Sequence, residues 1–239
     1  MTPSKSPTAA FIAMMATIIS IVALSTDIML PVLPQIAHDL NVADENDTHL
    51  VVSVLFIGFA FGQLLVGPLS DAYGRRPVIF VSYGVFFVGC IMTTFATSFE
   101  LLLMGRLLQG AGIAGPRIVS NAIIRDLFSG RTMARVMSLI MMLFVLVPIV
   151  APLVGQTIAQ FGGWRSTFAT LLGVGILSCI WFAVAQPETL PTSARTQFSL
   201  RTLWNGAKYV VTNRAAIGYI ITLGFIFGPF LGYLGISQK

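Results

Sequence analysis

Three ionisable residues, Asp27, Arg106 and Arg117, lie inside long apolar segments of this 239-residue chain. A charged side chain is costly at the depth of the hydrocarbon core, so each marks a functional position that needs a partner. Asp27 lies near the end of one segment, and Arg106 lies near the start of another. Since a helix rises about 1.5 Å per residue, both would lie roughly 8–9 Å below the same membrane surface. The two side chains can therefore meet if their helices are adjacent.

Asp27 is the member of this pair that can titrate, because arginine stays protonated. Separating Asp27 from Arg106 would favour protonation of the carboxylate, and reuniting them would favour its release. The pair would thus couple a proton to a helix movement. The alternatives are a static ion pair and snorkelling to the outer interface. Arg117 follows Arg106 by three helical turns on nearly the same face, where it either lines a cavity or reaches the inner surface.

The composition excludes an ordinary soluble domain. Apolar residues make up 56% of the chain and charged residues only 10%, against about 25% in a typical soluble domain, and the mean hydropathy is +0.86. The excess apolar surface must face lipid. The net charge of +5 does not predict a nucleic-acid partner, because the basic residues are scattered among loops. No metal-ligand cluster, cofactor motif or nucleophile–base pair is present, so we expect no metal, no cofactor and no enzymatic activity.

The hydropathy pattern predicts an all-α membrane protein, since a span needs about 20 apolar residues. We expect seven spans with these approximate bounds: Ala9–Leu33, Leu50–Leu69, Val78–Ala96, Leu101–Ile124, Ala134–Phe161, Trp164–Ala185 and Ala215–Ile236. The first is too long for the apolar region of a signal peptide and is interpreted as a retained helix.

Lysine and arginine in the connecting loops predict a cytoplasmic amino terminus. The outer side would then carry only Arg165 and Lys239. The inner side would carry ten basic residues: Lys5, Arg75, Arg76, Arg125, Arg131, Arg135, Arg195, Arg201, Lys208 and Arg214. This bias argues against a seven-helix receptor, whose amino terminus is external.

A short charged segment separates the second and third predicted spans. It reads Gly67-Pro-Leu-Ser-Asp71-Ala-Tyr-Gly74-Arg75-Arg76-Pro, and its glycines and prolines predict a tight reversal between antiparallel helices. The pattern G-x-L-S-D-x-x-G-R-R resembles the signature loop of the major facilitator superfamily of secondary transporters.

Three further segments resemble patterns of this superfamily. Thr26-Asp27, followed by Pro31 and Pro34, is similar to the end of helix 1 in twelve-span drug:proton antiporters. Arg106-Leu-Leu-Gln109-Gly110-Ala-Gly resembles their R-x-x-Q-G-x-G motif, whose arginine is implicated in proton coupling. The run from Pro148 through Pro152 to Gly155 resembles the G-P-x-x-G-G antiporter motif, with two of its glycines replaced. The subgroup most similar to this chain is the bicyclomycin/chloramphenicol-type multidrug efflux antiporters.

This resemblance implies roles for further residues. Asp71 and Arg75 would interact with Asp126 and latch the inner side, although Ala72 stands where many members have arginine. The substrate cavity would be lined by Asp27, Met29, Arg106, Gln109, Gly110 and Arg117. Substrates would be small, largely apolar molecules exchanged for protons.

The resemblance also implies the organisation of the chain. Residues 1–186 would form the six-helix amino-terminal half of the fold, 187–214 a cytoplasmic linker with an amphipathic helix, and 215–239 the first helix of a second half. We expect a multi-pass protein of the bacterial inner membrane whose partners are lipid, substrate, protons and the remaining half. The alternative is a truncated fragment that does not transport.

Overall fold

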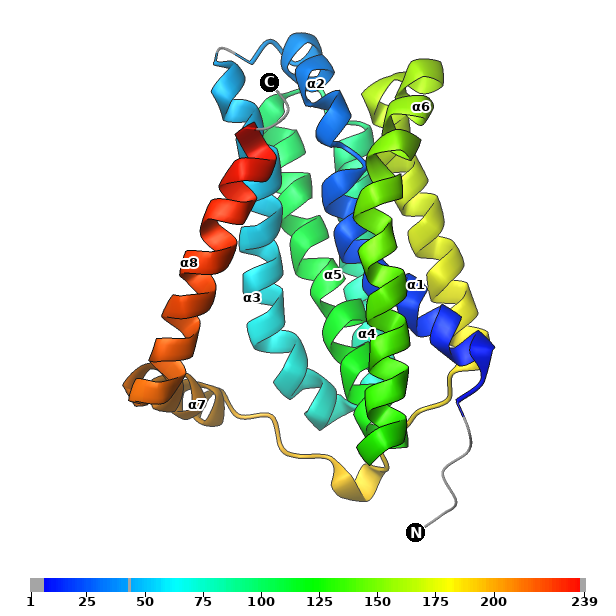
Figure 1. Cartoon of the computed structure of the whole chain (residues 1–239), viewed down its shortest axis with the longest axis vertical. Coiled ribbons are helices and arrows are strands. Elements are labelled where there is room, and N and C mark those ends of the chain that lie inside the picture. The colour runs from blue at the N-terminus through cyan, green and yellow to red at the C-terminus, as the bar shows by residue number, and fades with distance from the viewer. Residues whose placement is uncertain (1–6, 43, 237–239) are drawn as a thin grey trace. The chain divides into compact units, whose positions relative to one another are not determined.

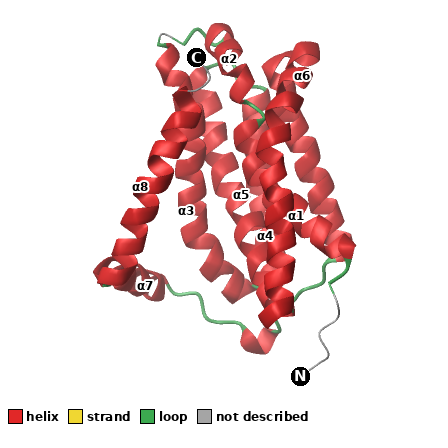
Figure 2. Ribbon diagram, in the orientation of Figure 1, coloured by secondary structure: helices red, strands yellow, loops and turns green. Residues whose placement is uncertain are grey.

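The described part of the chain, residues 7–42 and 44–236 of the computed structural model, is built from helices and contains no strand (Figure 2). It separates into two compact units, Met1–Arg195 and Thr196–Lys239, so the boundary falls inside the predicted linker. Lys5 and Lys239, which entered the prediction of orientation, lie outside the described residues.

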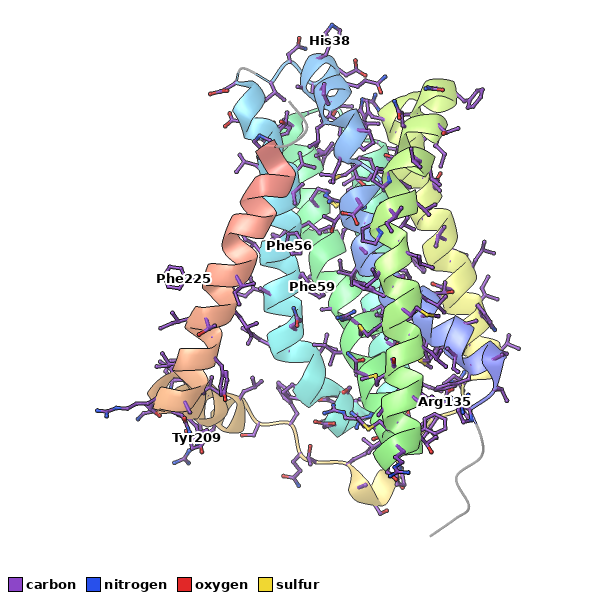
Figure 3. All side chains as sticks on the ribbon, viewed as in Figure 1. His38, Phe56, Phe59, Arg135, Tyr209 and Phe225 are labelled. Carbon is purple, nitrogen blue, oxygen red and sulfur yellow. The ribbon has the colours of Figure 1, made fainter. Side chains whose placement is uncertain are left out.

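The first unit is a bundle of long helices that run side by side (Figure 1). Its α-helices are α1 (Ala9–Asp27), α2 (Leu33–Asp39), α3 (Leu50–Tyr73), α4 (Arg75–Thr94), α5 (Phe99–Leu127) and α6 (Gly130–Ala185). Helix α5 packs against both α3 and α4, and α1 packs against α6 and α5. Figure 3 shows His38, predicted to be outside, and Arg135, predicted to be inside, at opposite ends of this unit.

Each of the seven predicted spans falls on a helix, but the first is interrupted. Helix α1 ends at Asp27, and a short 3-10 helix, Leu30–Val32, precedes α2. The reason is the pair Pro31 and Pro34, since proline lacks an N–H and disfavours helix at the residue before it. Asp27 therefore lies at the end of a helix rather than within one.

The predicted signature loop is almost entirely helical, so the tight reversal expected from the sequence is confined to a single residue. Asp71 belongs to α3, Arg75 and Arg76 begin α4, and Gly74 alone separates the two helices. Gly74 has φ 103°, a conformation that glycine adopts without steric strain. One residue thus reverses the chain and leaves Asp71 and Arg75 close enough to form an ion pair across the break.

Helix α6 is 56 residues long and changes direction at Gly163, where φ is 67°. Its length of roughly 80 Å exceeds twice the thickness of a hydrocarbon core, so it contains the two predicted spans on either side of Gly163. Pro148 and Pro152 remain inside the first of these two parts without a break in helical geometry.

By length and hydropathy, four helical segments of the described chain could cross a membrane, or five if α7 and α8 count as one bent span. The four are Ala9–Asp39, Asp47–Tyr73, Arg75–Thr94 and Gly130–Ala185. Helix α5 is long enough but is not among them, because Arg106, Arg117 and Gln109 lower its hydropathy. Arg106 and Gln109 are buried against the neighbouring helices instead of facing lipid.

The second unit consists of α7 (Leu200–Thr212) and α8 (Arg214–Ile236). The segments Leu203–Thr212 and Arg214–Ile226 meet at 82°. If α8 crosses the membrane, α7 therefore lies close to the membrane plane, with Trp204 on its apolar face and Arg201 and Lys208 beside that face. This geometry fits the predicted interfacial helix.

Gly155 on α6 is buried against the chain segment that directly follows α1. A β-carbon at this position would lie 1.9 Å from the carbonyl oxygen of Ile28, the residue after α1. Only glycine allows this approach, as is common where membrane helices pack tightly. Packing within the bundle thus explains why glycine occupies position 155 of the motif that resembles the antiporter motif.

We predict that Gly155→Ala lowers the melting temperature of the detergent-solubilised chain, since the added methyl group must displace backbone, at a cost of about 1–3 kcal/mol or more. The matched control is Gly173→Ala on the same helix, where a β-carbon meets nothing within 4 Å. Equal melting temperatures for the two variants would contradict the close approach.

Candidate functional site

The centre of the first unit is organised by Arg106 on α5, whose side chain is fully buried. Its Nη2 donates to the Ser25 carbonyl oxygen on α1 at 3.0 Å, and its Nε donates to the Val51 carbonyl oxygen on α3 at 3.0 Å. The guanidinium also lies 5.7 Å from the ring centroid of Phe168 on α6. One side chain therefore contacts three other helices of the bundle.

Gln109 extends this network to α4. Its Oε1 accepts from Arg106 Nη1 at 2.8 Å. Its Nε2 donates to Thr93 Oγ1 at 3.1 Å and to Cys90 Sγ at 3.2 Å. Gln109 thus uses both ends of its amide, which fixes its orientation. The motif Arg106…Gln109, predicted from the sequence, is a buried hydrogen-bond relay through the bundle.

Asp27 does not form an ion pair with Arg106 in this conformation. No ion pair and no hydrogen bond to the Asp27 carboxylate occurs among the described residues, although the residue is only 8% exposed. Arg106 instead binds the carbonyl of Ser25, two residues earlier on α1. The hypothesis of a direct contact between the two charged side chains is therefore wrong for this state. Asp27 remains a buried carboxylate without a counter-charge.

Two other residues predicted to line a cavity are packed inside the bundle. Met29 is fully buried in the hydrophobic core. Gly110 lies where α5 meets α3, and a β-carbon there would come within 2.0 Å of the Leu55 carbonyl oxygen. Close packing explains both residue types. A role in substrate binding stays a prediction for them, as it does for Arg106 and Gln109.

A second polar cluster lies where α3 and α5 end and α4 begins. It contains the residues of the predicted latch. Arg75 donates through Nε to Asp126 Oδ2 at 3.0 Å and through Nη1 to Asp71 and to Ser70 Oγ. Arg75 is only 6% exposed. Arg76 points elsewhere, with Nη2 donating to the Ala183 carbonyl oxygen at 2.8 Å. The predicted grouping of Asp71, Arg75 and Asp126 is present in the structure, whereas Gly67 has open space around it.

Glu188 is a member of this cluster that the sequence analysis missed. Its two carboxylate oxygens accept from the backbone N–H groups of Arg75 and Arg76, each at 3.0 Å. A carboxylate at the first turn of α4 compensates the positive end of the helix dipole. The adjacent Thr189 donates its hydroxyl to Asp126 at 3.0 Å. The segment after α6 is thus fastened to the signature motif.

The opposite end of the unit is held by Gly163, Trp164 and Arg165. Trp164 Nε1 donates to Asp39 at the end of α2, at 2.9 Å, and Arg165 donates to the Ala96 carbonyl oxygen after α4, also at 2.9 Å. Hydrogen bonds from His38 and from Trp164 lower the pKa of Asp39. This cluster, at the predicted outer end, connects α2 and the loop after α4 to the bend of α6 at Gly163.

An apolar cavity of about 330 Å³ lies between α1 and the two halves of α6. Its lining is almost entirely hydrocarbon and comprises Ala13, Ala16, Thr17, Ser20, Ile21, Leu24, Leu143, Val147 and Val174. Ser20 and Leu24 lie seven and three residues before Asp27, so they share its face of α1. None of the predicted cavity residues lines this space. Among the described residues, no group of three or more potential ligands could hold a metal ion.

The fold and this site define a multi-span membrane protein that buries charged residues in its helical bundle. The sequence profile of the Major Facilitator Superfamily matches residues 15–238. The chain belongs to this superfamily, and its structure is a partial major facilitator fold.

Among the most similar curated relatives is the uncharacterized MFS-type transporter YdgK of Bacillus subtilis, 33% identical over 213 residues. The bicyclomycin resistance protein homolog of Haemophilus influenzae is 31% identical over 208 residues, and the multidrug resistance protein MdtM of Escherichia coli is 29% identical over 214. The matches cover 88%, 87% and 90% of this chain but 53%, 52% and 52% of the relatives. The chain therefore spans about half the length of these relatives.

Solved structures agree on the fold. The crystal structure of the human organic anion transporter MFSD10 matches with a TM-score of 0.65 at 20% identity, covering 86% of this chain and 53% of that one. A crystal structure of the peptide transporter POT in complex with alafosfalin matches with a TM-score of 0.67 at 16% identity, covering 98% and 51%. At these identities the similarity concerns the fold alone.

The cap formed by Glu188 predicts a pH-dependent contribution to stability. Burial alone would raise the pKa of Glu188, but hydrogen bonds from the backbone N–H groups of Leu190, Arg76, Arg75 and Thr189 outweigh burial and lower it. A carboxyl whose pKa is lowered on folding stabilises the fold above its unfolded pKa of about 4.3, and this contribution is lost as the pH falls through the folded value.

We therefore expect Glu188→Gln to destabilise the chain by about 1 kcal/mol at pH 7 and to differ less from the wild type in acid. Thermal melts in detergent across pH would measure this. The control is Asp47→Asn, which removes one exposed carboxylate far from this cluster. If the loss of stability in Glu188→Gln, relative to the wild type, did not become smaller at acidic pH, this result would argue against the charged cap.

Proposed function

We propose that this chain forms half of a secondary transporter that exports small, largely apolar molecules in exchange for protons. The observation that carries the proposal is Asp27, a buried carboxylate at the end of an apolar helix without a partner among the described residues. A carboxylate in that setting is unstable unless it gains a counter-charge or a proton. It is therefore suited to take up a proton when the surroundings of α1 change.

The proposed coupling runs through α1. The Ser25 carbonyl, two residues before Asp27, holds Arg106. A movement of the end of α1 that breaks this hydrogen bond would also move Asp27 relative to the fixed positive charge of Arg106. Approach of the two charges would favour proton release, and separation would favour proton uptake. The interruption after Asp27 gives this end of α1 a place to bend.

Two observations support an apolar substrate. The cavity beside α1 presents almost only hydrocarbon, and two of its lining residues, Ser20 and Leu24, share the helix face that carries Asp27. Two relatives are named as a bicyclomycin resistance protein homolog and a multidrug resistance protein. Drug-like molecules with a large apolar part are therefore the proposed substrate class.

The proposed setting is the bacterial inner membrane with the amino terminus in the cytoplasm, supported by the bias of basic residues toward one set of loops. A second half is proposed to complete the transport path, because the relatives are about twice as long as this chain. Transporters of this superfamily work by rocking two halves around a site near the membrane midplane. The 239-residue chain alone is therefore expected to insert but not to transport.

The test replaces Asp27 with asparagine in vesicles that contain this chain together with the polypeptide supplying the second half. Asp27→Asn keeps the shape of the side chain but removes the titrating group, so proton-driven efflux of a fluorescent drug should fall to background. Insertion and melting temperature should remain close to those of the wild type.

The matched control is Glu100→Gln, which removes an exposed carboxylate at the predicted outer end of α5. It should retain full efflux. Undiminished efflux by the Asp27→Asn variant under a pH gradient would refute proton coupling through Asp27. Substrate-dependent proton flux by the isolated chain would refute the need for a second half.

A further inference from the structure

Arg117 is an arginine of the bundle interior whose charge the described residues do not balance. It lies on α5, eleven residues after Arg106 and on nearly the same helix face, roughly 16 Å nearer the predicted inner end. Its guanidinium lies 5.0 Å from the centroid of the Phe144 ring on α6. No described acid lies within ion-pair distance of it.

Unsatisfied polar atoms gather around Arg117. Arg117 Nη1, Ser120 Oγ and Asn121 Oδ1 are buried and have no hydrogen-bond partner. Ser120 is fully buried. Residues three and four positions apart lie on one side of a helix, so these three side chains form a single patch, here called the Arg117 cluster. Buried polar groups are nearly always paired, and three unpaired groups together indicate a missing partner.

The charge of the Arg117 cluster defines the kind of partner. Arg106 is satisfied by carbonyl oxygens, and Arg75 is satisfied by Asp71 and Asp126. Arg117 has only the face of an aromatic ring, so the edge of its guanidinium, including Nη1, has no hydrogen-bond partner among the described residues. That edge presents N–H groups in the fork geometry that binds two oxygens of a carboxylate, sulfonate or phosphate. The Ser120 hydroxyl can donate to the same group, and so can the Asn121 amide, whose nitrogen and oxygen ends are interchangeable by rotation.

The aromatic ring that Arg117 contacts belongs to the same part of α6 as two residues of the apolar cavity. Phe144 lies beside Leu143 and one turn before Val147, and both of these line the apolar cavity between α1 and α6. An amphipathic anion could therefore place its acidic group at the Arg117 cluster and its apolar part along Phe144. A cationic compound would meet an uncompensated positive charge in the same place.

We propose that Arg117, Ser120 and Asn121 bind the acidic group of amphipathic small-molecule anions. This inference rests on the proposed export function, of which it names a substrate class. It predicts that the transporter prefers aromatic or aliphatic acids to their neutral or cationic counterparts, because only an acid supplies the partner that the cluster lacks.

The test measures binding to the purified 239-residue chain in a neutral detergent by isothermal titration calorimetry. The probes are naphthalenesulfonate and its uncharged isostere naphthalenesulfonamide. The sulfonate should bind the wild type at least about tenfold more tightly than the sulfonamide. Arg117→Gln should remove this difference and leave sulfonamide binding unchanged.

Arg135→Gln is the matched control, because it removes one exposed arginine at the same predicted end of the bundle and should keep the tenfold preference. Asn121→Leu serves as a second variant that keeps all charges, and it should weaken sulfonate binding several-fold. Equal sulfonate affinity in the wild type and the folded Arg117→Gln variant would overturn the proposal. So would an Asn121→Leu variant with undiminished preference for the sulfonate.

Phospholipid headgroups carry the same anionic chemistry, so the titration is repeated with phosphatidylglycerol added to the detergent. Persistence of sulfonate binding supports a small-molecule site. Complete loss of sulfonate binding would indicate that the cluster binds the lipid phosphate instead, and it would overturn the proposal. Because binding is measured without transport, the inference stands if proton coupling fails. The inference is refuted, while the proposed export function stands, if proton-driven efflux occurs without any preference for anions.

Discussion

The fold of the first unit depends on how the charge of Arg106 is accommodated. Arginine stays protonated even when it is buried, so its environment must supply acceptors. Here they are the carbonyl oxygens of Ser25 and Val51 and the amide oxygen of Gln109. Leaving any of these N–H groups unpaired in the interior would cost about 1–3 kcal/mol or more. The guanidinium therefore fixes the distances between α1, α3 and α5.

Three polar layers divide the bundle along its length. Trp164 and Arg165 hold the predicted outer end, Arg106 and Gln109 hold the middle, and Arg75 with Asp126 and Glu188 holds the predicted inner end. Along α5, the Arg117 cluster lies between the middle layer and the inner layer. In the proposed mechanism only the middle layer responds to protonation. The reason is that Asp27 lies two residues after Ser25, whose carbonyl oxygen binds Arg106. A latch role for the inner layer stays a prediction.

The sequence predicts the helical class and the positions of the spans, because hydropathy determines them directly. The grouping of Asp71, Arg75 and Asp126 was expected only from the resemblance of the signature loop to that of the superfamily. The sequence does not predict that Asp27 and Arg106 are apart, because the partners of Arg106 are backbone carbonyls, which no residue type reveals. The sequence analysis missed Glu188 because this residue lies in a polar segment with the composition of a linker, 113 residues after Arg75 along the chain. The extent of helix around Gly74 was missed because the turn residues Gly67 and Pro68 lie within α3.

Hydrogen–deuterium exchange of the Arg106→Lys variant tests most directly whether one guanidinium joins these helices. Lysine keeps the charge but cannot serve three acceptors in different directions. Arg117→Lys, on the same face of α5, is the control. Exchange should become faster in Arg106→Lys both at the end of α1, around Ser25, and at the start of α3, around Val51, and should stay unchanged at both places in Arg117→Lys. Wild-type protection at both places in Arg106→Lys would contradict the central role of Arg106.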